Sequence, residues 1–370
     1  MPVKERVLEK RAVARIVRHL PRRPVVDVPA DVTLADIGLP DGDLLAIATD
    51  GLSEEIATGL YCVPATIGWV LVMAAVSDLA AAGARLVGVA TNLNLPREFG
   101  PSDRDRLARG IGDACRSLNT VTLGGDVNVA AQLTAAATAI GLVRRKRLLA
   151  RRGARPGDAI YLSGPAGLGN AYALSRFDPA RSPRRLRFRP RARIDFGPLL
   201  AGWASCCMDT SDAVLATLDE LASVNRACFA ITEDPAAFLH PHAAGQCRRR
   251  GLPGWLALAG CHGEFELAFT VPRAVERSFL RACRASRLRP VRIGEVRKGR
   301  GVTMEFGGRP VRLDTARLRN LAFEAAADVG GYMRALVEFA REVAVAGAGT
   351  GKARAPGRAA PKAGTRAGGR

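Results

Sequence analysis

The 370-residue chain has few aromatic side chains and few histidines, which narrows both its fold and its chemistry. Aromatic residues make up 5% of the sequence, whereas hydrophobic residues together make up 48%. Cores dominated by Ala, Val, Leu and Gly favour closely packed α/β layers over an aromatic-rich β-sandwich. Only four histidines are present, so a general base built on imidazole has few candidates. The chain is too long for one ordinary core, and we expect two domains.

Several common motifs are also missing. The eight cysteines form no CxxC pair and mostly lie in apolar runs, which is typical of free thiols in a reducing compartment. The group His240, His242, Cys247, Cys261 and His262 matches no standard zinc spacing. The chain has neither the GK[ST] of a phosphate-binding P-loop nor the Gly-x-Ser-x-Gly elbow of a serine hydrolase. A zinc site is therefore disfavoured, and the sequence does not support a P-loop nucleotide enzyme or a serine hydrolase with this elbow.

No segment reads as a signal peptide or a membrane span. The first 20 residues alternate charged and apolar side chains instead of forming a continuous apolar core. The longest apolar stretch, residues 63–84, is interrupted by Ser77 and Asp78, which indicates a buried helix. We therefore expect a cytoplasmic protein without a membrane partner.

The net charge of +20 raises the question of nucleic acid, but the charge is unevenly spread. Residues 346–370 contain six basic side chains and no acid, and their Gly, Ala and Pro content predicts a disordered tail. Such a tail allows weak, nonspecific contact with nucleic acid. A second run, Arg181–Arg193, holds seven arginines and two prolines. It is either a solvated loop or a phosphate-steering surface, and the loop is favoured because charge runs usually face water.

The rest of the chain alternates short apolar runs with amphipathic segments, which predicts an α/β (α+β) fold. The expected helices are residues 3–19, 64–82, 102–118, 170–176, 211–224 and 273–286; the expected strands are residues 44–49, 86–93, 121–123, 133–143, 159–163, 228–232 and 266–271. A turn cluster at residues 153–158 marks a change of character. We expect domains at 1–148 and 149–345, followed by the tail at 346–370.

Five aspartates stand at element ends or in glycine-containing turns, where side chains can converge on a cleft. Asp50 follows an apolar strand, Asp126 ends a Gly-Gly turn, and Asp209 and Asp212 bracket a Thr-Ser pair. Asp78 interrupts an apolar helix, which is costly unless it is paired or bound to metal. Two of these aspartates have a structural alternative: Asp212 could cap the helix that follows it, and Asp50 could start a turn. Because magnesium takes carboxylate and phosphate oxygens, the set predicts a metal and phosphate site.

A glycine-rich loop, Gly164–Gly169, precedes an expected helix. Its backbone amides could bind phosphate at the helix N-terminus. The glycine spacing matches neither the dinucleotide fingerprint nor the P-loop, so a tight turn is the favoured interpretation.

Taken in order, these segments resemble thiamine-monophosphate kinase, a family of the aminoimidazole-ribonucleotide-synthetase (AIR synthase-related) superfamily. The resembling stretches are Ala48-Thr-Asp-Gly-Leu52, Val76-Ser-Asp-Leu-Ala-Ala-Ala-Gly-Ala84, Gly124-Gly-Asp126, Arg151-Arg-Gly-Ala-Arg-Pro-Gly-Asp158, Met208-Asp-Thr-Ser-Asp212 and Gly263-Glu-Phe-Glu-Leu-Ala-Phe-Thr-Val-Pro272. They cover roughly residues 30–300, and the second and fourth stretches are the specific ones.

The resemblance implies two AIR-synthase-like domains, with an N-terminal sheet that forms a barrel in a homodimer, and ATP with several magnesium ions in the cleft. The family's metal positions fall on Thr49, Asp50, Asp78, Asp126, Asp209 and Asp212. Its nucleotide-contact positions fall on Gly125, Asp126, Arg151 and Ser211. Asp78 and Asp212 would be catalytic, in a transfer of the γ-phosphoryl group that depends on positioning and electrostatics.

The chain departs from the family at the acceptor side. Ala57 stands where a histidine is expected, Gly263 replaces a substrate-contacting glutamate, and Thr315 takes the place of a late tryptophan. The Gly-Asp-Asp motif expected near residues 31–34 reads Asp31-Val-Thr-Leu34, so that one ligand has either shifted to Asp31 or been lost. Loss of paired polar groups changes or weakens the choice of substrate. The sequence therefore predicts an ATP- and magnesium-dependent phosphotransferase with an altered acceptor site; the alternatives are a superfamily enzyme with another acceptor, or a non-catalytic nucleotide-binding protein with a basic tail.

Overall fold

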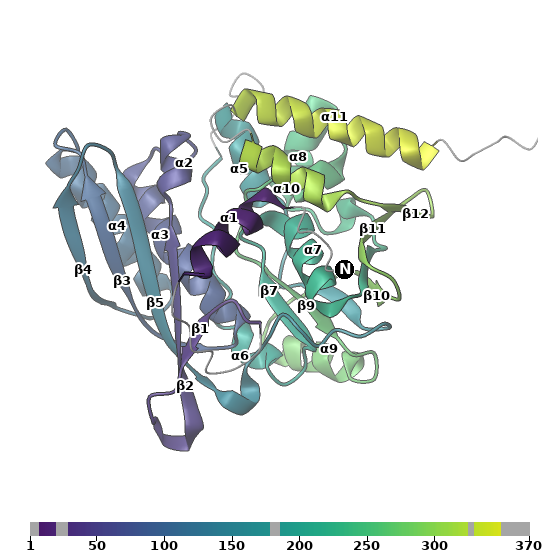
Figure 1. The fold of residues 1–370 in the computed structure, drawn as a ribbon, viewed down its shortest axis with the longest axis horizontal. Coiled ribbons are helices and arrows are strands. Elements are labelled where there is room, and N and C mark those ends of the chain that lie inside the picture. The colour runs from purple at the N-terminus through teal and green to yellow at the C-terminus, as the bar shows by residue number, and fades with distance from the viewer. Residues whose placement is uncertain (1–6, 20–28, 178–185, 325–328, 349–370) are drawn as a thin grey trace, which may run out of the picture.

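The structure, a computed structural model, describes residues 7–19, 29–177, 186–324 and 329–348. Its strands form a five-stranded and a seven-stranded sheet (Figure 1). The first sheet uses strands between residues 33 and 144, and the second uses strands between residues 159 and 312. This mixed architecture confirms the predicted α/β (α+β) class. The domain boundary expected at 148/149 lies in the segment that links the two sheets.

The first sheet has the order β1-β2-β5-β3-β4. Its strands are β1 (Thr33–Ala35), β2 (Asp43–Gly51), β3 (Arg85–Leu95), β4 (Thr122–Val129) and β5 (Thr134–Arg144). Neighbouring strands run antiparallel, except that β3 and β4 are parallel. Buried and half-exposed residues alternate along β2 and β5, so one face is covered and the other is open.

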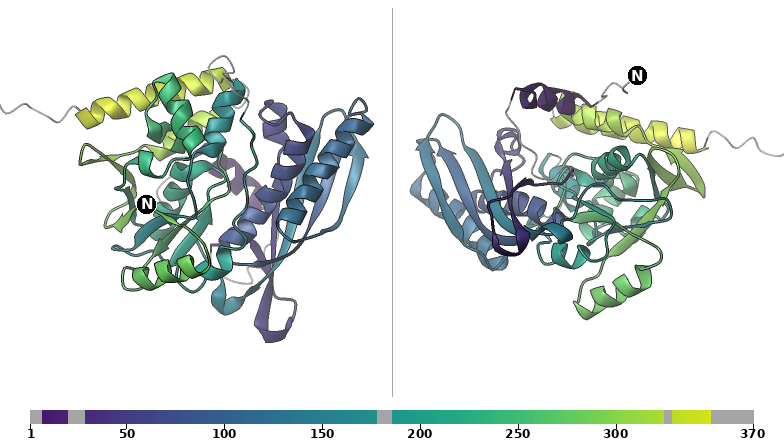
Figure 2. Two further views of the ribbon diagram at one scale, coloured as in Figure 1. Left: turned by 180° about the vertical axis from the view of Figure 1, so that it is seen from behind. Right: turned by 60° about the horizontal axis from the view of Figure 1, so that its bottom comes forward.

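Helix α3 (Pro64–Ala81) lies between the two sheets, with α4 (Pro101–Ser117) beside it (Figures 1 and 2). A helix with apolar residues on every side is stable only when other elements surround it, which explains the composition of α3. The two helices approach closely: a Cβ atom on Gly68 would lie 2.2 Å from the backbone oxygen of Leu107. By length and composition α3 could cross a membrane, yet most of it is buried inside this fold, as we predicted.

The second sheet has the order β12-β11-β8-β10-β6-β9-β7. Its strands are β6 (Ala159–Leu162), β7 (Cys206–Asp209), β8 (Cys228–Ile231), β9 (Leu267–Val271), β10 (Val291–Arg297), β11 (Gly301–Phe306) and β12 (Arg309–Arg312). The remaining α-helices are α1 (Leu8–Val17), α2 (Ser53–Ala57), α5 (Leu168–Phe177), α6 (Gly197–Leu200), α7 (Ala213–Asn225), α8 (Pro241–Arg250), α9 (Glu276–Ala285), α10 (Thr315–Glu324) and α11 (Val329–Ala348). Only β8 and β11 pair in parallel in this sheet.

One hydrophobic core joins the two sheets through α3. Val72 of α3 belongs to the same buried cluster as Ala139 of the first sheet and Phe269 of the second. Aspartates at the end of α3 and at the end of β7 are thereby brought to one place.

Three local predictions are wrong. The segment Gly124–Asp126 lies inside strand β4 rather than in a turn. Helix α4 begins after Gly100, with Pro101 in its first turn, so Ser102 is not its N-cap. Helix α11 continues to Ala348, past residue 346 where we expected the tail to begin; residues 349–370 lie outside the described part of the chain.

The arginine run is not simply a solvated loop in its described part, residues 186–193. Phe188 and Ala192 are buried, and Trp69 of α3 donates a hydrogen bond of 2.6 Å from Nε1 to the backbone oxygen of Pro190. The guanidinium of Arg189 stacks 3.9 Å from the centre of the Trp69 ring. The apolar residues between the arginines thus fix this segment against α3.

Candidate metal and phosphate site

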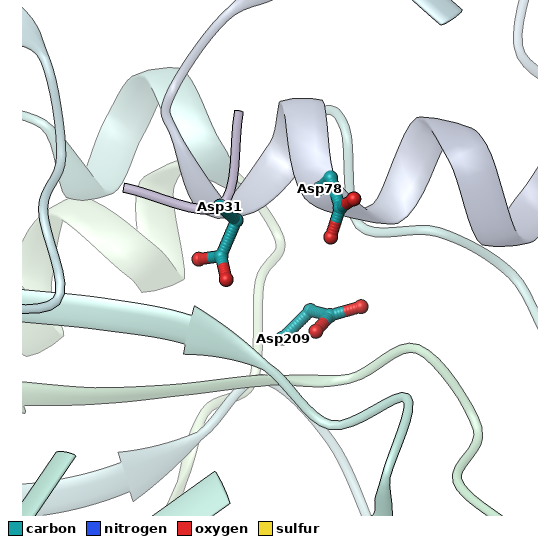
Figure 3. A group of neighbouring side chains, drawn as sticks. All are labelled: Asp31, Asp78 and Asp209. Carbon is teal, nitrogen blue, oxygen red and sulfur yellow. The ribbon is translucent and has the colours of Figure 1, made fainter. Parts of the chain in front are cut away.

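Three aspartates from distant parts of the chain meet between the two sheets (Figure 3). Asp78 comes from the last turns of α3, Asp209 ends β7, and Asp31 lies just before β1. One carboxylate oxygen from each lies within 4.8 Å of the others. We call these three residues the aspartate cluster.

Burial makes this concentration of negative charge costly without a cation. It raises the pKa of Asp31 to about 7 although Arg151 acts in the opposite direction. Burial, followed by the charges of Asp209 and Asp50, raises the pKa of Asp78 to about 10. Burial also raises the pKa of Asp209. A bound divalent cation would stabilise the ionised carboxylates and reverse these shifts.

Two oxygens of the cluster are available to a metal. Asp31 Oδ2 and Asp209 Oδ2 are buried and make no hydrogen bond of normal geometry among the described residues; the nearby Ser77 hydroxyl, which lowers the pKa of Asp209, also lacks one. Buried polar atoms normally have a partner, so two unpaired carboxylate oxygens in one cluster call for an explanation. Hard cations such as magnesium prefer this kind of ligand, and the donor set therefore fits magnesium.

Asp50 lies beside the cluster, but the hydroxyl of Thr49 does not. Asp50 follows Leu44, Ala46 and Ala48 on the covered face of the first sheet. Burial, followed by the charges of Asp209 and Asp212, raises the pKa of Asp50 to about 6. The Thr49 side chain lies on the open face, where its Oγ1 is 3.0 Å from that of Thr138.

Arg151 holds Asp31 in position. Its Nε donates to Asp31 Oδ1 at 2.8 Å, and its Nη2 donates to the same oxygen. Its backbone amide donates to the backbone oxygen of Pro29 at 2.8 Å. Nη1 also lies 3.9 Å from Glu220. Arg151, which the resemblance assigns to nucleotide contact, thus orients a carboxylate of the cluster in this structure.

Ser211 and Asp212 frame the other side of the cluster. Ser211 Oγ donates to Asp209 Oδ1 at 3.0 Å. Asp212 is the N-cap residue of α7, but its side chain makes no capping hydrogen bond, and 54% of that side chain is exposed. Arg319 of α10 approaches to 4.0 Å from Asp212 Oδ2. Capping therefore does not account for the Asp212 side chain.

The structure does not bring Gly125 or Asp126 to the cluster. In the register of the sheet, Asp126 of β4 lies opposite Asn92 of β3. Asn92 lies opposite Ala136 of β5, which in turn lies opposite Gly51 of β2. Asp126 is therefore three strand spacings from β2, about 14 Å away, and on the open face. Gly125 has a packing role instead, because a Cβ atom there would lie 2.4 Å from the backbone oxygen of Thr91.

The glycine-rich loop already binds an internal carboxylate. The amides of Gly167 and Gly169 donate to Glu264 Oε2 at 2.9 and 3.1 Å. Glu264 is 4% exposed, and burial raises its pKa to about 7. The tight-turn interpretation therefore holds, and these two amides do not form a free phosphate site.

The sequence indicated one further site residue, Asp31, only in part, and it did not indicate another, Arg319. The sequence left open whether the missing metal ligand had shifted to Asp31 or been lost. In the structure, the Asp31 carboxylate joins the cluster. Its position ahead of the first strand, close to the expected Gly-Asp-Asp motif, was the available signal. Arg319 carried no signal, because it approaches Asp212 only through the packing of α10 near α7.

Family models match most of the chain. The AIR synthase related protein N-terminal domain matches residues 30–143, and the corresponding C-terminal domain matches residues 155–307. The chain belongs to the AIR synthase-related family. The matched residues contain nearly all of the first sheet, every strand of the second sheet except β12, and every residue of the aspartate cluster.

Relatives within this family include thiamine-monophosphate kinases. The one from Aquifex aeolicus is 27% identical over 271 residues, which is 70% of this chain and 84% of the relative. The one from Synechococcus elongatus is 32% identical over 190 residues, covering 47% and 58% of the two chains. These relatives support an ATP-dependent, kinase-like enzyme.

Solved structures show the same fold. AaThiL complexed with AMPPCP and TMP has a TM-score of 0.66 at 23% identity and covers 84% of this chain and 96% of its own. The HypE–HypF complex contains a chain with a TM-score of 0.68 at 16% identity, covering 82% and 98%. The two-domain AIR-synthase-like fold that we expected is therefore confirmed.

Proposed function

We propose that the protein is an ATP- and magnesium-dependent phosphotransferase of the thiamine-monophosphate kinase type, with an altered acceptor site. The observation that carries this proposal is the buried aspartate cluster with its two unpaired carboxylate oxygens. A site of this kind suits magnesium together with the phosphates of ATP.

In this proposal Asp31, Asp78 and Asp209 hold magnesium, and Asp50 and Asp212 extend the acidic surface towards the phosphates. Bound magnesium would neutralise charge on the phosphates. The protein's own contribution is positioning: Arg151 fixes Asp31, and Ser211 fixes Asp209. Asp78 and Asp212 remain our candidates for catalytic residues.

The acceptor side supports a substrate other than thiamine monophosphate as a second candidate. The amide of Gly263 donates to the backbone oxygen of Ser211 at 2.9 Å. A Cβ atom on Gly263 would lie 1.6 Å from the backbone oxygen of Thr210. The substrate-contacting glutamate of the family is therefore not merely shortened here, because this backbone path leaves no room for a side chain.

The other two altered positions do not replace that contact. Thr315 is 5% exposed and donates from Oγ1 to Asp219 Oδ1 at 2.6 Å, so it has a local role at the start of α10. Ala57 is exposed at the end of α2. Neither side chain can recognise a polar acceptor as histidine or tryptophan would.

We further propose a homodimer that forms through the open face of the first sheet. No described helix covers this face (Figure 2), and it presents the half-buried side chains Ile47 and Ile140. Exposed apolar sheet surfaces of this kind mark interfaces. Thr49 and Asp126, on the same face, would then lie in the interface.

We also place the protein in the cytoplasm, since its eight cysteines form no disulfide. A role for the basic tail in nucleic-acid contact stays a prediction, because residues 349–370 lie outside the described part of the chain.

ADP release by the full-length protein tests the function. We expect magnesium-dependent release that a phosphate-ester acceptor stimulates, and we expect Asp78→Asn to reduce the rate at least a hundredfold because a carboxylate of the cluster is lost. Asp105→Asn, an exposed substitution on α4, should leave the rate unchanged.

The choice of acceptor separates the candidates. Stimulation by thiamine monophosphate supports the first, whereas stimulation only by other phosphate or alcohol acceptors supports the second. Tight ATP binding without turnover in the presence of any acceptor contradicts both and indicates a non-catalytic nucleotide-binding protein.

A further inference from the structure

A cavity lies beyond β6, away from the aspartate cluster. It has a volume of about 330 Å³ and is bordered by residues 163–165, 191–193, 195–196 and 287–289. Ser163 pairs with Leu267, which in turn pairs with Asp209, so the cavity begins two strand spacings, about 10 Å, from the cluster. We call it the arginine pocket.

Four arginines border the arginine pocket, and they come from two segments far apart in the sequence: Arg191, Arg193, Arg287 and Arg289. Asp195 is the only acidic residue among the described residues that line it, and it lies 3.4 Å from Arg191. Arg287 and Arg289 are exposed and make no ion pair within the described ranges. The pocket therefore carries an excess of positive charge.

Arg193 is held rigidly at the wall of the arginine pocket. Its Nε donates to Glu266 Oε2 at 2.8 Å, and its Nη2 donates to Oε1, which makes a two-point ion pair. Glu266 is 5% exposed and also accepts a hydrogen bond from Ser163 Oγ. A guanidinium has five N–H donors, so donors remain for a ligand. Because its orientation is fixed in advance, little side-chain entropy is lost on binding.

The pair of Arg193 and Glu266 also depends on a glycine. A Cβ atom on Gly164 would lie 2.9 Å from Glu266 Oε2 and 3.0 Å from Arg193 Nη2. The charged pair thus packs directly against the backbone at this position, and a larger residue would displace it.

Arg287 occupies a backbone position that normally favours glycine. At the end of α9 the amide of Leu288 donates to the oxygen of Cys283 at 2.8 Å, and the amide of Arg287 donates to Arg284 at 3.1 Å. This is the Schellman pattern, in which the residue after the cap is left-handed, and Arg287 has φ of 56°. Glycine would be more stable there, so folding does not explain the arginine.

We propose that the arginine pocket binds a small molecule that carries a phosphate group with at least two negative charges. Guanidinium groups match phosphate oxygens through paired hydrogen bonds. A single carboxylate would leave most of the positive charge uncompensated. The volume is in the range of small-molecule sites and too confined for a macromolecular surface. This site is separate from the aspartate cluster and does not depend on phosphoryl transfer.

Isothermal titration of the full-length protein with inorganic pyrophosphate tests the proposal. Metal-free buffer removes metal-bridged binding at the aspartate cluster. We expect saturable binding, weakened about tenfold by each of Arg287→Gly and Arg289→Gln, because each removes charge-assisted hydrogen bonds. Arg284→Gln, on α9 outside the pocket, removes the same charge and should leave the affinity unchanged.

Arg287→Gly also separates binding from folding. Its thermal midpoint should equal or exceed that of the wild type while its affinity falls, which a purely structural role would not produce. The proposal is overturned if pyrophosphate does not saturate, if Arg284→Gln weakens binding as much as the pocket variants, or if Asp78→Asn rather than the arginine variants abolishes it. The proposal is also overturned if pyrophosphate shows no saturable binding while Arg287→Gly and Arg289→Gln lose affinity for a single-stranded oligonucleotide. That result would indicate a nucleic-acid surface.

Discussion

At the scale of single residues, the site is defined by the cost of placing carboxylates together in a buried position. Asp78 was the most informative residue in the sequence, because a charge inside an apolar helix needs a partner. The nearest charged neighbours of Asp78 among the described residues are the carboxylates of Asp31 and Asp209, not a cation bonded to Asp78 itself. Arg151 approaches the cluster, but its hydrogen bonds go to one oxygen of Asp31. The remaining negative charge is what a metal would neutralise.

Gly263 is the residue at which the acceptor side of this chain differs most clearly from the pattern of the thiamine-monophosphate kinase family. We expect Gly263→Ala to destabilise the protein by about 1–3 kcal/mol, because its Cβ would overlap the backbone oxygen of Thr210. Urea unfolding measures the change. Gly202→Ala is the control, since a Cβ atom there has its nearest neighbour at 3.8 Å, and it should stay within about 0.5 kcal/mol of the wild type. Equal stability of the two variants would contradict the described path of residues 261–266.

At the scale of elements, the period of the apolar pattern located the long central helices and strands, but it predicted none of β10, β11, β12, α8, α10 and α11. Helix α3 was predicted at nearly its observed bounds because Pro64 and Gly83 mark its ends. Strand β4 was cut short at Gly124, because two glycines before an aspartate also suit a turn. Pairing with β3 overrides that local preference. For the same reason Asp126, which looked equivalent to the other aspartates, lies on the opposite face of the sheet.

The open face of the first sheet leads to a prediction about assembly. We expect the wild type to be a dimer in light scattering coupled to size-exclusion chromatography, and Ile140→Lys to be a monomer, because a buried charge in the interface is costly. Val13→Lys, at a 51% exposed position on α1, is the matched control and should remain a dimer. A monomeric wild type would contradict the proposed interface.

At the scale of the whole molecule, one core around α3 joins two sheets that follow each other in the sequence. The order of the motifs was sufficient to predict the family and the two-domain fold. The convergence of Asp31, Asp78 and Asp209 could not be derived from spacing, since it depends on how the second sheet packs on α3. The arginine pocket likewise joins residues 191–193 and 195–196 to residues 287–289 and has no local signature.

The central claim is that the aspartate cluster binds a divalent cation, and thermal unfolding against pH tests it most directly. Asp31, Asp50 and Asp78 have folded-state pKa values of about 7, 6 and 10, all raised from 3.8. A carboxyl with a raised pKa contributes stability that is fully present below its unfolded value and is lost as pH rises through the folded value. Without metal, the thermal midpoint should therefore decrease as the pH rises from 5 to 8, which is roughly the range in which Asp31 and Asp50 ionise.

Magnesium should raise the midpoint more at pH 8 than at pH 5, because it binds the ionised carboxylates. Asp78→Asn should remove most of this magnesium effect, whereas the exposed Asp105→Asn should keep it. A wild-type midpoint that does not respond to magnesium at pH 8, or an Asp78→Asn variant that responds as the wild type does, would contradict the claim.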